Sequence, residues 1–588
     1  MVWDRLRRTY FPFRMNISVF DQRRAGLLFP VYSLRRNSDM GVGDTAAVLE
    51  AIDFCSDHGF SVLQLLPIQE TLGDPSPYSP VSSRALSPSL LTLTPEKVPG
   101  LTQEDLENLA PESWILELRK GNVDHANINT LKNKLLTRAA KHFFDSTPER
   151  ESGEKFANFQ EAQEEWLPAY TLYRTLVEMY DGNTKWTSWR LEQQSYSAAK
   201  EWLEQQSDRE TLEQRRKEFA FIQWVAWQQW REVREYADQR QVRMIGELTF
   251  GVSANSCDVW ANPPLFDTSW HLGTRPLSHF DTNKDSEVWG QNWGLPAYRW
   301  ENHRASQFKW LRGRIAWQKE FFHGCRLDHL RGYFRAYMFP WPGGERHVEF
   351  SSMNEQEAAA ATGGLLPRFV PGPDEDPITA EMNRLQGNEI IGQLIEEAGD
   401  MDMVAEIMGD MPEYMSRTLD ELQLANLRFP QLERGSDHRI NAPDTFRELG
   451  LITYANHDNA PLAMLYLHLL SSAEKDPESA SARDLKALME FANWKEASPP
   501  EITTELLEKL QEALFKTSSR LAVLMCSDLI GLPLRFNLPG SYGEKTWSDR
   551  LPMTLTELQQ HTVYGARIET AARLIKQTER VPHQSPIQ

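Results

Sequence analysis

The chain has few cysteines, and their spacing forms no recognisable framework. Cys55, Cys257, Cys325 and Cys526 lie far apart in the 588 residues, and none belongs to a Cys-x-x-Cys pair. A disulfide scaffold or a cysteine zinc site is therefore not expected. The sequence also has no run of about 18 apolar residues, as a membrane-spanning helix would need. No apolar stretch follows the basic N-terminal residues, so we expect a cytoplasmic protein.

Positive charge is also scarce. The sequence has 63 Lys and Arg against 83 Asp and Glu, which gives a formal net charge of -20. This balance disfavours binding to nucleic acid or to an anionic membrane, and it suits neutral or cationic ligands. Neither a Gly-x-Gly-x-x-Gly fingerprint nor a Walker loop is found, so no organic cofactor is expected. The oligomeric state stays open.

Short apolar segments alternate with helix-like ones along the chain. Hydrophobic residues make up 40% of the sequence, enough for a large core. Residues 25–34 and 61–67 indicate buried strands, joined by a helix that Asp44 can cap and Gly59 can end. Six more strands are predicted, at 242–248, 325–330, 403–407, 426–432, 451–456 and 521–527. Eight strands with helices between them predict an α/β fold, a (β/α)8 TIM barrel with large, mostly helical insertions.

The chain divides into three expected segments. Residues 1–94 hold the start of the barrel with its first two strands. Residues 95–215 are polar and helical in pattern and form an expected insertion, with an irregular patch at 146–154. Residues 216–588 supply the remainder of the barrel, with loop insertions. This last segment begins with a long helix whose apolar face, including Phe219, Ile222 and Trp230, is typical of core packing.

The richest cluster of ionisable residues is Arg326-Leu-Asp328-His329-Leu-Arg331-Gly332, at the predicted end of the fourth strand. Strand ends are where α/β proteins carry out chemistry. Two arginines and a histidine beside Asp328 favour its ionised form, and an ionised carboxylate can act as a nucleophile. The same residues could form a surface salt-bridge cluster, so other strand ends must decide between these interpretations.

Two other predicted strand ends carry carboxylates. Glu406 follows apolar residues in Val404-Ala405-Glu406-Ile407, a setting that raises a carboxyl pKa toward proton donation. His457 and Asp458 follow the seventh strand. The carboxyl ends of parallel barrel strands open on one face, so these groups can converge. One ionised and one protonated carboxyl are what retaining cleavage of a glycosidic bond requires, and Asp458 would stabilise the cationic transition state.

The sequence resembles the amylomaltases, also called 4-α-glucanotransferases or disproportionating enzymes, which are relatives of the α-amylases. The resemblance is carried by the heptapeptide around Asp328 and by further motifs in the family's order, from about residue 24 to 550. These are Gly26-Leu-Leu-Phe-Pro, Gly41-Val-Gly-Asp44, Leu65-Leu-Pro-Ile, Ser76-Pro-Tyr78, Ser256-Cys-Asp-Val-Trp-Ala261, Gly290-Gln-Asn-Trp-Gly-Leu-Pro296 and Asn537-Leu-Pro-Gly540. The insertion after Thr94 matches least.

The resemblance implies a role for each matching position. It makes Asp328 the nucleophile, Glu406 the acid/base and Asp458 the stabiliser, with maltooligosaccharides or other α-1,4-glucans as substrates. It also implies a set of substrate-binding residues: Arg326, His329 and His457 around the reacting sugar, Tyr78 stacking on it, and Asp258 and Trp293 in the cleft. Trp260 and Trp289 are further candidates for an acceptor surface.

The sequence departs from the family pattern at several points. The acid motif lacks its usual acidic neighbour, because Ile407 follows Glu406. Asn456 replaces the usual Thr before His-Asp-Asn, and Gly246-Glu247 replaces the usual Gly-Asp. The loops after Gly332 and around Pro371 are also atypical. These departures concern substrate length preference more than the chemistry.

Three other functions keep the same residues. A plain α-glucan hydrolase needs the same carboxylates, and the products formed from maltotriose distinguish it from a transferase. A barrel metallohydrolase could use His329, His457 and the carboxylates as ligands, although no His-x-His pair lies on the first strand and neighbouring arginines oppose a cation. A glucan-binding protein without turnover is disfavoured, because Asp328, Glu406 and Asp458 are all present.

Overall fold

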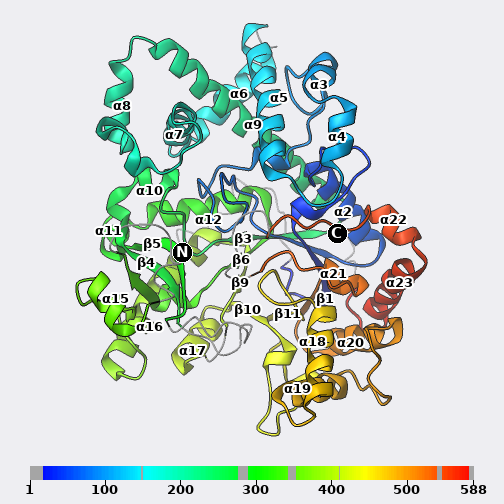
Figure 1. The fold of residues 1–588 in the computed structure, drawn as a ribbon. Helices are drawn as coiled ribbons and strands as arrows, with labels where there is room; N and C mark the ends of the chain where they lie inside the picture. Colours follow the sequence, from blue (N-terminus) through cyan, green and yellow to red (C-terminus); the bar gives the residue numbers. More distant parts are fainter. Residues whose placement is uncertain are drawn as a thin grey trace, which may run out of the picture.

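The computed structural model describes residues 18–146, 150–275, 289–341, 353–408, 411–538 and 546–581. Eight parallel strands close into a barrel in the order β1-β12-β11-β10-β9-β6-β3-β2 (Figure 1). The predicted (β/α)8 barrel is thus confirmed, with each strand within its predicted segment or one residue from it. The strands are β1 (Arg24–Phe29), β2 (Val62–Leu65), β3 (Arg243–Leu248), β6 (Gly324–Leu327), β9 (Asp402–Ala405), β10 (Ala425–Arg428), β11 (Gly450–Ile452) and β12 (Leu521–Met525).

The register of three neighbouring strands, β3, β6 and β9, determines which charged side chains lie together at the mouth of the barrel. Glu247 of β3 pairs with Arg326 of β6, and Leu327 of β6 pairs with Ala405 of β9. Asp328 and Glu406 each follow the last residue of their strand, so they continue this register one step beyond the ladder. Because side chains alternate along a strand, Arg326 and Asp328 point to the same side. The backbone therefore brings these four groups together.

Helices cover the outside of the barrel. The Asp44 side chain accepts a hydrogen bond from the backbone N–H of Ala47 and caps α2 (Thr45–Asp57), as predicted. Gly59, with φ +81°, follows this helix. The other helices around the barrel are α12 (Lys309–Phe321), α16 (Pro377–Ala398), α17 (Glu413–Glu421), α18 (Leu462–Lys475), α19 (Ala480–Phe491), α20 (Thr504–Lys516), α21 (Cys526–Ile530), α22 (Leu555–Gln560) and α23 (Thr562–Gln577).

A group of helices lies between β2 and β3, at the top of Figure 1. They are α3 (Gln103–Leu109), α4 (Glu112–Leu118), α5 (His125–Asp145), α6 (Arg150–Ala162), α7 (Leu167–Met179), α8 (Tyr196–Glu204) and α9 (Arg209–Gln239). We propose that α3–α8 form the helical insertion expected at 95–215. Helix α9 begins ahead of the expected boundary, and its predicted apolar face is buried. Helix α6 covers much of the patch expected to be irregular, of which 147–149 lie outside the described residues.

A four-stranded antiparallel sheet stands beside the barrel mouth, and the sequence analysis did not predict it. Its order is β5-β4-β7-β8. Strands β4 (Phe266–Thr274) and β5 (Gln291–Tyr298) follow β3, and β7 (Ala336–Pro340) and β8 (Arg368–Val370) follow β6. Short helices α10 (Cys257–Ala261), α11 (Trp300–Ala305), α13 (Arg331–Phe334) and α15 (Glu355–Ala361) connect or flank these strands. Two separate barrel loops therefore build one small sheet.

No helix in the described part of the chain combines the length and apolar character needed to cross a bilayer.

Candidate active site

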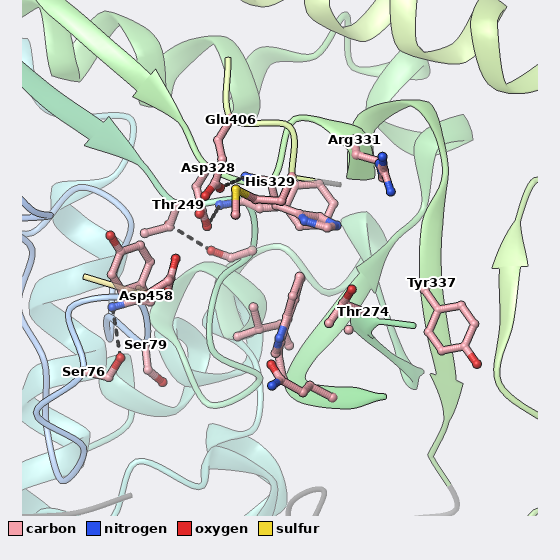
Figure 2. A pocket seen from close by; sticks show the side chains of 18 of the residues that line it. Ser76, Ser79, Thr249, Thr274, Asp328, His329, Arg331, Tyr337, Glu406 and Asp458 are labelled. Atoms are coloured by element: carbon pink, nitrogen blue, oxygen red, sulfur yellow. Dashed lines mark hydrogen bonds between the residues drawn. The ribbon is translucent and has the colours of Figure 1, made fainter. Parts of the chain in front are cut away.

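A pocket of about 280 Å³ opens at the carboxyl ends of the barrel strands and extends over the antiparallel sheet. Figure 2 shows Asp328, Glu406 and Asp458 on one side of this pocket, and Arg331, Thr274 and Tyr337 on the other. The predicted site residues that line it are Tyr78, Trp293, Asp328, His329, Glu406, His457 and Asp458. Side chains from β2, β3, β6, β9 and β11 or the loops after them thus converge as the barrel topology predicted.

One guanidinium connects the carboxyl groups at the barrel mouth. Arg326 is almost fully buried, and its Nη2 lies 2.6 Å from Glu406 Oε1. Its Nη1 contacts Glu247 Oε1 and lies 3.5 Å from Asp328 Oδ1. Asp328 and Glu406 therefore flank the same cation on one rim of the pocket. We call the set Glu247, Asp328, Glu406 and Asp458 the acidic floor.

Glu247 is a member of the floor that the sequence analysis noted only as a departure from the family pattern. Its Oε1 accepts a hydrogen bond of 2.6 Å from the Tyr78 hydroxyl and also contacts Arg326. Burial raises the pKa of Glu247, against the opposing charges of Arg326 and His457. Glu247 thus holds two groups of the pocket in place from beneath.

The backbone also orients the two central carboxylates. The N–H of His329 donates to Glu406 Oε2 at 3.0 Å, and the N–H of Phe250 donates to Asp328 Oδ2 at 3.2 Å. His329 has φ +45°, in the left-handed region that residues other than glycine seldom adopt. The floor is therefore held by the turns after β3 and β6 as well as by Arg326.

The surroundings of Asp328 differ from those expected from its neighbours in sequence. Burial, and then the negative charge of Glu406, raise the pKa of Asp328 well above its usual value, with Arg326 opposing. Arg326 is closer to Glu247 and Glu406 than to Asp328, and Arg331 lies across the pocket. Burial lowers the pKa of His329 to about 4, so its ring is neutral. Of the three basic residues next to Asp328 in sequence, His329 is therefore neutral, Arg331 lies across the pocket, and only Arg326 places a positive charge near the carboxyl group.

Glu406 also differs from its expected surroundings. The sequence placed it among apolar neighbours, whereas the structure gives it the Arg326 ion pair and the His329 N–H. Its contacts are polar and directional. Such contacts fix the orientation of the carboxyl group, which a purely apolar pocket would leave free to rotate.

Asp458 and His457 form an ion pair at the opposite edge of the floor. His457 Nε2 lies 3.0 Å from Asp458 Oδ2. Burial alone would lower the pKa of His457, but Asp458 and Glu247 raise it above its usual value. Burial likewise opposes the ionised form of Asp458, yet His457 and Arg326 lower its pKa. Each partner of the pair thus favours the charged form of the other.

Aromatic rings form part of the pocket wall. The Tyr78 ring stacks on His457, with centroids 4.5 Å apart and planes 27° apart. Trp293 meets the His329 ring edge to face at 4.8 Å. His457 Nδ1 also lies 3.0 Å from the Tyr78 hydroxyl, and because that hydroxyl donates to Glu247, it accepts from the His457 N–H. These contacts fix Tyr78 and Trp293 as walls of the pocket.

Three residues predicted to contact or face the substrate lie outside the described pocket lining. Among the described residues, Asp258 is not part of the pocket wall, because its carboxylate accepts from Ser83 N, Ser83 Oγ and Trp310 Nε1 and is structural. Arg326 does not line the described pocket and instead contacts three carboxylates of the floor. Trp260 is fully buried and donates to the Gln193 carbonyl, so it belongs to the core.

The far side of the pocket holds residues that the sequence analysis did not assign. We call Arg275, Arg331, Arg335, Tyr337 and Phe369 the arginine arm. All five line the pocket, and they come from the ends of β4 and α13 and from β7 and β8. Arg331 was visible as part of the heptapeptide around Asp328. The others could not be placed without the antiparallel sheet.

Among the residues that the structure describes, no group of three or more His, Cys, Asp or Glu side chains is spaced to hold a metal ion.

A parallel barrel whose strand ends present paired carboxyl groups to a sugar-sized pocket defines a class of enzyme that acts on glycosidic bonds. Comparison with known proteins is more specific. The family model described as 4-alpha-glucanotransferase matches residues 29–556. The chain belongs to the 4-alpha-glucanotransferase family, and it is an enzyme of the glucan-transfer type.

Relatives and solved structures agree with this family. The chain is 26% identical over 567 residues to a 4-alpha-glucanotransferase of Chlamydia pneumoniae, covering 92% of this chain and 94% of the relative. The fold matches the amylomaltase of Streptococcus agalactiae solved with acarbose, with a TM-score of 0.72, 20% identity, and coverage of 95% and 100%. It also matches the amylomaltase of Corynebacterium glutamicum, with a TM-score of 0.73, 18% identity, and coverage of 94% and 76%.

Proposed function

We propose that Asp328 is the nucleophile, Glu406 the acid/base and Asp458 the stabiliser of a retaining glucan transfer. The observation that carries this assignment is the shared contact of Asp328 and Glu406 with Arg326 on one rim of the pocket. In this arrangement both carboxyl groups can flank one glycosidic bond, as double displacement with retention requires. Substrates are α-1,4-glucans such as maltooligosaccharides, and the setting is starch, glycogen or maltose metabolism in the cytoplasm.

The first half-reaction forms a covalent intermediate. A carboxylate oxygen of Asp328 attacks the anomeric carbon, the glycosidic C–O bond breaks, and the leaving oxygen takes a proton from Glu406. The ionised Asp458 stabilises the positive charge that develops on the sugar ring, and His457 holds Asp458 in position. The departing product is the shortened glucan.

The second half-reaction delivers the glycosyl group to an acceptor. Glu406, now ionised, takes the proton from a sugar 4-hydroxyl. The hydroxyl oxygen attacks the anomeric carbon, and the ester bond to Asp328 breaks. Transfer prevails over hydrolysis when the acceptor displaces water and is held in line for attack. Trp293, as a wall of the pocket beside His329, can orient that sugar.

The proton must lie on the correct carboxyl before attack. Burial, and then the negative charge of Glu406, raise the pKa of Asp328, and a raised pKa disfavours the ionised nucleophile. Catalysis uses ionised Asp328, with the proton on Glu406. We propose that attack starts from the form with Asp328 ionised, which Arg326 and the N–H of Phe250 stabilise.

Incubation of the purified protein with maltotriose tests the proposed function. Transfer produces a ladder of longer maltooligosaccharides together with glucose. A hydrolase would give only glucose and maltose, and a binding protein would leave maltotriose unchanged. Either of these two results would contradict the proposal.

A further inference from the structure

The pocket contains both a cluster of carboxylates and a cluster of guanidinium groups. A site that binds only neutral glucans does not require the second cluster. Three carboxylates of the acidic floor, from Asp328, Glu406 and Asp458, line the pocket together with the three guanidinium groups of the arginine arm. Figure 2 shows Arg331 across the pocket from these carboxylates. The protein as a whole has a net charge of -20. A concentration of positive charge inside the sugar pocket of so acidic a protein therefore needs a physical explanation.

The three arginines come close enough to repel one another. Arg331 and Arg335 are largely buried and stand at the two ends of the short helix α13, and Arg275 follows β4. Burial, and then the positive charges of Arg335 and Arg275, lower the pKa of Arg331 to about 10, and Asp374 partly offsets them. Like charges held together at the cost of repulsion are stabilised by an anion placed between them.

Arg335 is fixed by its neighbours. Its Nη2 lies 2.5 Å from Asp374 Oδ2, and its guanidinium carbon lies 3.8 Å from the centroid of the Phe369 ring. Asp374 is itself held by hydrogen bonds from Tyr414 and Asn383, at 2.8 and 2.9 Å. A guanidinium held by an ion pair and an aromatic face is preorganised, so little entropy is lost when it binds a ligand.

The arm also offers surfaces that suit a sugar ring. Tyr337 and Phe369 meet edge to face at 5.1 Å, and both line the pocket. Aromatic faces pack against the apolar faces of sugars, and guanidinium groups bind phosphate oxygens through paired N–H donors. The arm thus combines the two kinds of contact that a phosphorylated sugar requires.

We propose that the arginine arm binds a glucose unit that carries a phosphate monoester, next to the sugar that reacts at Asp328. A phosphate monoester brings a charge of about -1.5 to -2 near neutral pH, which offsets the clustered guanidinium groups. This inference rests on the proposed function and specifies its substrates further. The same ester can belong to a free sugar phosphate acting as acceptor or to a phosphorylated glucan acting as donor.

The full-length enzyme can be tested with matched neutral and phosphorylated sugars. With maltotriose as donor, we expect glucose 6-phosphate to have a KM at least about tenfold lower than glucose as acceptor. In a second arm, maltotriose carrying a 6-phosphate is compared with maltotriose as donor. A preference in the first arm identifies a free sugar phosphate, and a preference in the second a phosphorylated glucan. Either preference should shrink in 0.5 M salt, because screening weakens charge recognition.

Substitutions in the arginine arm test whether this group of residues causes the preference for phosphorylated sugars. R275Q and R331Q should each reduce the ratio between phosphorylated and neutral substrates toward one. R368Q is the matched control, since Arg368 lies on β8 of the same sheet over Trp270 and is not part of the described pocket lining. R368Q should keep the ratio. If R331Q does not fold, R275Q still gives the result.

Two outcomes would overturn the proposal: equal use of phosphorylated and neutral sugars in both arms, or a preference that R275Q and R331Q leave intact. Failure of the proposed function is a separate result, because it appears as the absence of a product ladder from maltotriose alone. In that case, calorimetric titration with glucose 6-phosphate against glucose still tests the arm.

Discussion

The two sides of the pocket are built by different architecture. The acidic floor stands at the ends of parallel strands, where register places Glu247 opposite Arg326 and Asp328 level with Glu406. The arginine arm stands on an antiparallel sheet and a four-residue helix made from loops. On the floor, carboxylates form ion pairs with Arg326 and His457, and these pairs hold the side chains in position. On the arm, like charges share one wall. We infer that the floor supplies the chemistry, and the arm selects which sugar enters.

Replacement of the nucleophile should show the largest effect. D328N removes the attacking oxygen charge, so we expect transfer from maltotriose to fall by about 10⁴-fold or more. D437N, on the exposed loop after β10, is the matched control and should keep normal turnover. If D328N retains more than a few per cent of activity, the floor is not the reacting centre.

Glu247 should act through its neighbours. E247Q removes the charge that holds Arg326 and accepts from Tyr78, so we expect kcat to fall about 10- to 100-fold with little change in KM. Glu247 is also one of the negative charges that raise the pKa of Asp328. The acid limb of the pH profile of kcat/KM should therefore move to lower pH.

The conservative variant separates positioning from folding. E247D keeps the charge but shortens the side chain, and it should recover part of kcat and the original acid limb. A fall in kcat without any movement of that limb in E247Q would assign Glu247 a purely structural role.

Trp293 tests the border between the floor and the arm. W293A removes the wall that meets His329, and we expect KM for maltotriose to rise about 3- to 10-fold with a smaller change in kcat. W270A removes a tryptophan of the same small sheet that lies outside the described pocket lining, and its KM should stay near normal. Equal effects of the two variants would mean that Trp293 only stabilises the sheet.

Asp528 provides a buried carboxylate away from both sides of the pocket. It accepts from the N–H of Leu462, and burial raises its pKa to about 7. The folded state therefore binds more protons than the unfolded state, so wild-type stability falls as pH rises from about 4 to about 7.

A neutral replacement should remove that pH dependence. The free energy of unfolding of D528N relative to wild type should be about 2 to 3 kcal/mol more favourable at pH 8.5 than at pH 4.5. Urea unfolding of both proteins at the two pH values measures this difference in the free energy of unfolding. An equal difference at both would show that Asp528 ionises normally in the folded protein.

The barrel and the location of its carboxylates were predictable from the sequence because both depend on local patterns. Buried parallel strands are short apolar runs, and Asp328 and Glu406 each stand directly after one. The antiparallel sheet was missed because Gly273 and Pro296 interrupt its apolar pattern. Its two strand pairs also come from separate loops, and no local signal links them.

The side chains that surround Asp328 could not be predicted correctly from the sequence. The sequence places Arg326, His329 and Arg331 beside it, but strand alternation and α13 send Arg331 across the pocket. Asp258 was expected in the cleft but lies outside the described pocket lining, because motif resemblance does not show which groups a side chain contacts. Its carboxylate is occupied by Ser83 and Trp310, contacts that span 175 and 52 residues.

Covalent trapping at Asp328 tests the central claim most directly. An α-glucosyl fluoride needs no proton donor to lose fluoride, so E406Q should form the glycosyl-enzyme but lack the base that activates an acceptor. Peptide mass spectrometry should then find one glucosyl group on the peptide that contains Asp328, absent in the E406Q/D328N double variant. A label on another carboxylate, or continued transfer without any labelled peptide, would contradict the account.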